Sequence, residues 1–76
     1  MQDTYHIDPI VLDGQLVALA GPRRCYLLTT DLAPDRLTLV AAMCLCSREV
    51  RAGRLRGPFT SELAERWAEL YTSMGG

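Results

Sequence analysis

A run of apolar residues from Leu37 to Ser47, LTLVAAMCLCS, constrains the fold of this chain more than any other feature. At the helical spacing of about 100° per residue, the apolar side chains of this region form two stripes on roughly opposite sides. The first stripe consists of Leu37, Val40, Ala41 and Cys44, and the second of Leu39, Met43, Cys46 and Val50. Because such a helix needs cover on both sides, we expect a central helix packed against a sheet and against a second helix or a second copy of the chain.

Two antiparallel strands are predicted near the N-terminus. Tyr5 to Leu12, YHIDPIVL, has the β-branched and aromatic residues of a strand. Pro9 cannot donate a ladder hydrogen bond, so this strand should lie at an edge or carry a bulge. The pair Asp13-Gly14 precedes the apolar run QLVALA, and an Asp-Gly pair between apolar runs is typical of a tight hairpin.

A third strand and two helices follow in the prediction. Residues 21–24 form a turn and Cys25–Thr30, CYLLTT, the third strand. The first helix starts after a cap at Asp31 and runs to about Ala52, with Gly53 as its stop. Thr60 caps a second helix, Ser61–Ser73, whose apolar face should contain Leu63, Trp67, Leu70 and Tyr71. The predicted fold is therefore α+β, with a three-stranded antiparallel meander followed by two helices.

Length and composition indicate one small folded domain, residues 1–76. An apolar content of 49% provides enough side chains to bury, so disorder is not expected. The formal net charge of −1 argues against general binding to nucleic acid, which depends on many unopposed cations. All eight basic residues are arginine, a bias that favours a GC-rich genome such as that of an actinobacterium or one of its phages.

Three cysteines and one histidine match the ligand count of a Cys3His zinc site, but their spacing does not suit one. Cys44 and Cys46 are two residues apart in the predicted helix and point about 200° away from each other. We therefore predict that Cys25, Cys44 and Cys46 are buried free thiols that form no disulfide, and that neither they nor His6 bind metal. The N-terminus lacks a basic region followed by an apolar stretch, and the central apolar run is shorter than the roughly 20 residues that span a bilayer. These features favour a cytoplasmic protein.

No segment matches a motif of catalysis or cofactor binding. The phosphate-binding pattern GxxxxGK[ST], the dinucleotide pattern GxGxxG and the nucleophile elbow GxSxG are all absent from the sequence. We therefore expect a protein that is not an enzyme and that needs no cofactor.

Four arginines form the best candidate for a functional surface. Arg48, Arg51, Arg54 and Arg56 cluster at the end of the first helix and in the following loop. Arginine near the C-terminus of a helix also complements the helix dipole, so the cluster has a structural interpretation as well. Its functional interpretation is contact with an acidic protein surface.

The preferred interpretation is a small non-enzymatic module, an inhibitor or accessory factor, that acts by protein–protein contact. A homodimer is expected, with Leu39, Met43, Cys46 and Val50 as its interface. A winged-helix regulator that binds nucleic acid is a less favoured alternative, because the second helix carries three glutamates and one arginine. A third interpretation follows from element order, which is similar to that of the peptide-recognition modules of peptide-modifying systems. This resemblance implies binding of a peptide by strand addition.

Overall fold

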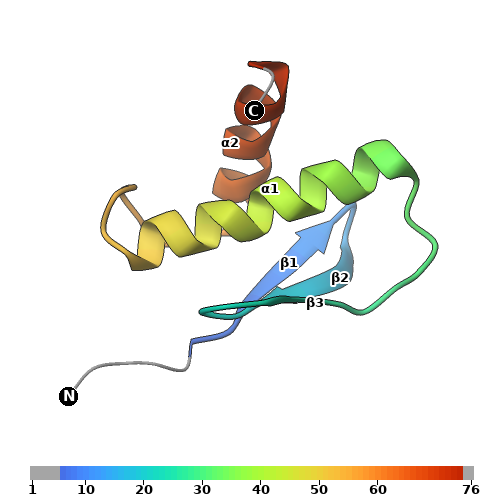
Figure 1. Cartoon of the computed structure of the whole chain (residues 1–76), viewed down its shortest axis with the longest axis horizontal. Coiled ribbons are helices and arrows are strands. Elements are labelled where there is room, and N and C mark those ends of the chain that lie inside the picture. Colours follow the sequence, from blue (N-terminus) through green and yellow to red (C-terminus); the bar gives the residue numbers. More distant parts are fainter. Residues whose placement is uncertain (1–5, 75–76) are drawn as a thin grey trace.

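The computed structural model of the chain describes residues 6–74 and consists of a sheet, a central helix and an outer helix (Figure 1). The elements are β1 (Asp8–Leu12), β2 (Gln15–Ala20), β3 (Cys25–Leu27), α1 (Pro34–Arg51) and α2 (Ser61–Ser73). The strands form one antiparallel sheet in the order β1-β2-β3. The predicted α+β order of three strands and two helices is confirmed.

The hairpin between β1 and β2 has the turn that its sequence predicts. Asp13 and Gly14 both have positive φ angles, 54° and 76°, as a type I′ turn requires. β1 is an edge strand, and its pairing with β2 shifts register between Ile10 and Val11. Pro9 therefore lies on an edge strand with a bulge beside it. The described part of this strand begins at Asp8; Tyr5, its predicted start, lies outside the described residues.

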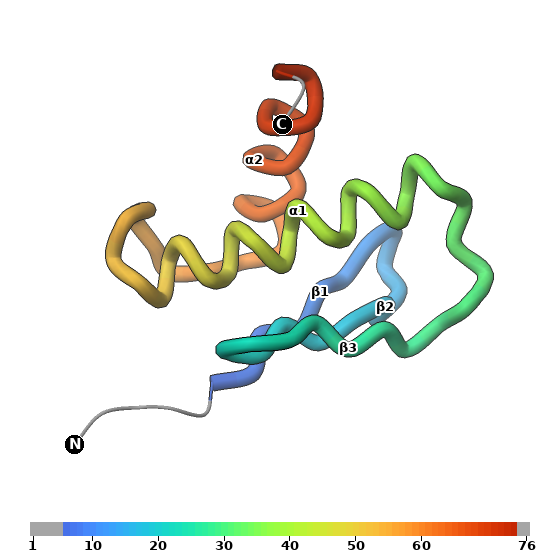
Figure 2. Tube along the Cα trace, viewed as in Figure 1, coloured from blue at the N-terminus to red at the C-terminus, as the bar shows by residue number. Residues whose placement is uncertain are grey.

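β3 is shorter than predicted. It ends at Leu27 rather than Thr30, and Leu28 makes the last backbone hydrogen bond to β2, at 2.9 Å from the carbonyl of Val17. The Thr29 hydroxyl then accepts a hydrogen bond from the backbone N–H of Asp31, which turns the chain away from the sheet. Figure 2 shows the resulting loop, which leads from β3 to the start of α1.

α1 begins three residues after the predicted cap. Its N-cap is Ala33, which makes no side-chain capping bond, and Pro34 occupies the first turn. The prediction of Asp31 as the cap is wrong, since Pro34 starts the helix without needing a donor partner for its missing N–H. Arg51 is the last helical residue, and Gly53, with φ of 80°, follows as the predicted stop.

α2 has the predicted bounds and cap. The Thr60 hydroxyl accepts a hydrogen bond from the backbone N–H of Leu63 at 3.1 Å. α2 starts beside β1, where Ser61 contacts the strand, then crosses α1 steeply and extends away from the sheet (Figure 1). Ala64 and Ala68 are fully buried, and their small side chains allow the two helices to approach closely. α1 is thus the central helix that its two apolar stripes predict, and α2 provides the second cover.

The core lies between the sheet and α1 and between the two helices. Ile10, Val40 and Met43 are its largest apolar side chains with almost no exposure. Trp67 and Tyr71 stack with ring centroids 5.0 Å apart and pack against the edge of this core. Leu70, expected on the apolar face of α2, is instead 61% exposed, because α1 covers only the part of α2 around its alanines.

Candidate functional site

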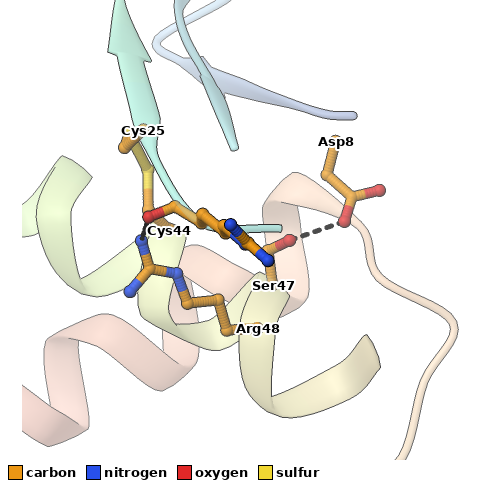
Figure 3. Close-up of a disulfide and its surroundings, with 6 residues drawn as sticks. Asp8, Cys25, Cys44, Ser47 and Arg48 are labelled. Atoms are coloured by element: carbon orange, nitrogen blue, oxygen red, sulfur yellow. Dashed lines mark hydrogen bonds between the residues drawn. A yellow bond between two sulfur atoms is a disulfide. The ribbon is translucent and has the colours of Figure 1, made fainter. Parts of the chain in front are cut away.

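Three of the four arginines predicted as a partner-binding cluster make contacts within the chain. The Nη2 atom of Arg48 donates to the backbone carbonyl of Arg23 at 2.8 Å (Figure 3). Arg51 binds a carboxylate of β1, and Arg54 forms a bidentate pair with Glu49, at 2.8 and 2.9 Å. The hydrogen bond from Arg54 lowers the pKa of Glu49.

Arg56 is exposed and, among residues 6–74, has neither a hydrogen bond nor an ion pair. The geometry therefore assigns structural contacts to Arg48, Arg51 and Arg54. Binding of a partner by the cluster stays a prediction.

The carboxylate that Arg51 binds is Asp8, which is only 5% exposed. Its Oδ1 atom lies 2.6 Å from Arg51 Nη2, and its Oδ2 atom lies 3.1 Å from Arg51 Nε. Oδ2 also accepts a hydrogen bond from the Ser47 hydroxyl at 2.6 Å (Figure 3). Burial alone would raise the pKa of Asp8, but the hydrogen bonds from Arg51 and Ser47 outweigh it and lower the pKa below its ordinary value. This network ties the end of α1 to the sheet.

The stripe predicted as a homodimer interface is mostly covered by the chain itself. Met43 and Cys46 have no exposed surface, and Leu39 and Val50 are half-buried. Within this stripe, only Leu39 and Val50 leave surface for a second copy. The dimer stays a prediction.

The outer edge of β1 is closed by α2. The Ser61 hydroxyl accepts a hydrogen bond from the backbone N–H of Val11 at 3.0 Å and donates to the carbonyl of Pro9 at 3.3 Å. Pro9 has no N–H of its own. A further strand would find the N–H of Val11 and the carbonyl of Pro9 already bonded to Ser61, and no N–H at Pro9, so this edge is poorly suited to strand addition.

The outer edge of β3 has no partner strand within residues 6–74. The backbone N–H of Leu28 donates to the carbonyl of Val17 on β2. Backbone groups in an antiparallel strand alternate in direction, so those of Tyr26, two residues earlier, also point toward β2. The N–H and C=O groups of Cys25 and Leu27 therefore point to the open edge. All three residues of β3 are exposed.

Apolar side chains lie on both sides of this open edge. Cys25 is bonded to Cys44 of α1, so the alternation of the strand also turns Leu27 toward the helix and Tyr26 toward the opposite face. Tyr26 is 50% exposed, Leu27 48% and the following Leu28 51%. An extended segment added to this edge would place its alternate side chains against these two apolar faces.

Two contacts join α1 to β3 and to the turn before it, and they show that the helix and the strand run in opposite directions. Arg48 donates to Arg23, and Cys44 is bonded to Cys25. The two contacts are two residues apart along the strand side and four apart along the helix, which are nearly equal lengths of about 6.6 and 6 Å.

We call the open backbone edge of β3 together with Tyr26, Leu27 and Leu28 the β3 site.

One end of the β3 site is basic. Arg23 and Arg24 are exposed in the turn that precedes β3, and Arg48 lies against the same turn. None of the three forms an ion pair with the part of the chain that the structure describes. A carboxylate beside the start of β3 would find these charges unopposed.

A hollow lies between α1 and the end of α2, with a volume of about 190 Å³. It is lined by Thr38, Ala41, Ala42, Leu45, Tyr71 and Thr72. Pockets for small molecules usually enclose about 300–1,000 Å³, and no charged residue lines this one. The hollow is a weaker candidate than the β3 site.

The prediction that all three cysteines are free thiols is wrong. Cys25 and Cys44 form a disulfide, with their Cα atoms 6.3 Å apart (Figure 3). Cys46 is a free, buried thiol. The helix geometry correctly predicts that Cys44 and Cys46 point in different directions. It carries no information on Cys25, whose position depends on β3 lying under α1.

The described residues hold no cluster of side chains suited to a metal ion. Within residues 6–74, no group of three or more His, Cys, Asp or Glu side chains could hold a metal ion. Ser47 is fully buried and donates to Asp8, and the Nε2 atom of His6 is buried without a hydrogen-bond partner. No helix in this part of the chain is long and apolar enough to cross a membrane.

No protein-family model, curated protein or solved structure matches this chain. Its function must therefore be argued from its own geometry. Sequence reasoning predicted a strand at Cys25–Thr30 but did not single out Tyr26 or Leu27, because their exposure depends on the strand order and on the extent of α1.

Proposed function

We propose that this chain is a non-enzymatic protein-binding module that takes an extended segment of a partner protein as a fourth strand along β3. The observation that carries the proposal is the difference between the two sheet edges. Ser61 and Pro9 close the edge of β1, whereas the edge of β3 is open between exposed apolar side chains. An edge strand without protection is a template for pairing with another chain.

The surroundings of the edge define the chemistry of the partner segment. Side chains at alternate positions should be apolar, to pack against Leu27 on one face and Tyr26 on the other. The end that lies beside Arg23 and Arg24 should carry a carboxylate. The partner is thus an extended, alternately apolar segment with an acidic end.

The nucleic-acid alternative has less support. Carboxylates of the same chain already pair with Arg51 and Arg54, and α2 carries Glu62, Glu65 and Glu69 beside its single Arg66. A recognition helix that faces phosphates should be more basic.

The test is selection of ligands from a random peptide library displayed on phage, with the full oxidised chain as bait. The best peptide is synthesised, and hydrogen exchange of the chain is measured with and without it. We expect the amide of Leu27, which faces the open edge, to exchange slowly only when the peptide is bound. The amide of Tyr26, which faces β2, serves as an internal control.

A substitution tests the same geometry. Leu27→Pro removes an outward-facing N–H, a change that edge strands tolerate, and should weaken peptide binding at least about tenfold. Leu70→Ala on α2 is the matched control and should leave the affinity unchanged.

Three results would overturn the proposal. They are failure to enrich any peptide, peptides that leave Leu27 unprotected, and association of the chain with itself through β3, which would make a second copy the occupant.

A further inference from the structure

The disulfide between Cys25 and Cys44 joins the first residue of β3 to the middle of α1, across 19 residues of sequence. It is a covalent link between the β3 site and the central helix (Figure 3). The third cysteine, Cys46, lies two residues further along α1 and takes no part in it.

β3 has few other anchors. It comprises three residues, pairs with β2 alone among residues 6–74, and buries none of its side chains. By contrast, β1 is held by β2, by Ser61 of α2 and by the buried ion pair of Asp8. A short strand with so little buried surface opens at low cost in free energy. The disulfide is therefore the main restraint that fixes β3 beside α1.

We infer that the Cys25–Cys44 disulfide is a redox switch for the β3 site: the oxidised chain holds β3 ready to accept a partner strand, and reduction releases β3 and weakens binding. This inference assumes the strand-addition function proposed above. It follows from preorganisation, because a partner that binds a mobile edge must also pay the entropy of ordering it.

The two cysteines differ in exposure, which favours attack at one of them. Cys25 is exposed and Cys44 is 5% exposed. The thiolate of a dithiol reductant attacks the Sγ atom of Cys25, the S–S bond breaks, and Cys44 leaves as a thiolate that takes up a proton. The second thiol of the reductant then attacks the mixed disulfide, releases Cys25 and closes its own disulfide. Two electrons pass from the reductant to the protein.

Cys46 does not interfere with this exchange. Its side chain points about 200° away from that of Cys44 around the helix and has no exposed surface. Burial, with a smaller effect of the nearby Glu49 charge, raises the pKa of the Cys46 thiol, and the thiolate is the nucleophile. Cys46 therefore stays a thiol in both states, and the switch has two forms.

The inference is tested first without any ligand, by hydrogen exchange of the oxidised chain and of the chain in excess dithiothreitol. We expect the amide of Tyr26 to lose its protection on reduction. The amides of Ile10 and Ala18, which pair β1 with β2, should keep theirs. Unchanged protection of Tyr26 would overturn the switch and leave the strand-addition proposal standing.

The second measurement is the affinity of the peptide selected from the library. Reduction should weaken binding by about tenfold, the effect of a site that is competent in about a tenth of molecules. The double substitution Cys25→Ser with Cys44→Ser should bind as the reduced chain does under both conditions, and Cys46→Ala should respond to reduction as the unchanged chain does. Equal affinities of the oxidised and reduced chains would overturn the inference. Failure of every selected peptide to protect Leu27 in the oxidised chain would instead remove the proposed function on which it depends.

Discussion

Asp8 on β1 and Arg51 in the last turn of α1 form a bidentate ion pair, with 2.6 Å between Oδ1 and Nη2 and 3.1 Å between Oδ2 and Nε. The carboxylate side is almost fully buried and the guanidinium side chain is 43% exposed. The pair fastens the end of the central helix to the start of the sheet. An arginine that is part of an apparent surface cluster in the sequence thus has a structural role.

Replacing Arg51 with alanine should destabilise the fold. It leaves the buried Asp8 carboxylate without its cation, and we expect a loss of about 1–3 kcal/mol, less than for a fully buried pair because the guanidinium is partly solvated. Urea unfolding followed by circular dichroism measures the loss. Arg54→Ala is the control, since its pair with Glu49 is exposed, and it should leave the unfolding midpoint nearly unchanged. Equal effects of the two substitutions would contradict this assignment.

The stability of the chain should fall in acid through Asp8. Because the folded pKa of Asp8 lies below its ordinary value, its contribution is fully present above the unfolded pKa of about 3.9 and is lost as the pH falls through the folded pKa. The stability difference between the unchanged chain and Asp8→Asn should therefore shrink between about pH 5 and pH 2. Urea titrations at several pH values measure this difference, and a difference independent of pH would argue against the lowered pKa.

The sequence was sufficient to predict the architecture because each element is marked by local chemistry. The Asp13-Gly14 pair specifies its hairpin, Thr60 marks the start of α2, and the two stripes of α1 require two covers. Element ends that depend on tertiary contacts were less predictable. β3 stops at Leu27 because the chain must turn toward α1, which its apolar sequence does not indicate.

Packing between the helices should be sensitive to added volume. Ala68 of α2 is fully buried, where α1 and α2 pack closely. Ala68→Leu should destabilise the chain by about 1–3 kcal/mol, because the extra methylenes force the helices apart. Leu70→Ala, on the exposed side of the same helix, should change stability by no more than about 0.5 kcal/mol. Thermal unfolding of the two variants compares them, and a harmless Ala68→Leu would mean that the contact is looser than described.

The candidate site was less predictable than the fold, since it consists of backbone groups and side chains that the folded chain leaves unpaired and exposed. The four arginines attract attention in the sequence, but whether each is paired depends on Asp8, Glu49 and the β2–β3 turn. The open edge of β3 is a property of backbone groups, which every sequence has. Its identification required the strand order and the position of Ser61 against β1.

Duplex DNA should bind weakly. Arg51 and Arg54 are paired with carboxylates, and the chain carries nine acidic residues against eight basic ones. In a fluorescence titration over a salt series, we expect low affinity and a shallow slope, as few counterions are released. The double substitution of Arg54 and Arg56 by alanine should change the affinity and the salt slope little. Tight binding with a steep slope that the double substitution abolishes would instead favour the winged-helix interpretation.

Thiol counting should distinguish the two roles of cysteine in this chain. Of three cysteines, two form the disulfide and one, Cys46, remains as a thiol. In the folded oxidised chain, Cys46 should react very slowly with an alkylating reagent, because it has no exposed surface and burial raises its pKa. Unfolding in urea without reductant should make one thiol reactive, and adding reductant should make all three reactive. Mass spectrometry of the alkylated chain counts them. Three reactive thiols in unfolded, unreduced protein purified without reductant would show that Cys25 and Cys44 are not joined. Rapid labelling of Cys46 in the folded chain would show that the contact between α1 and α2 opens readily.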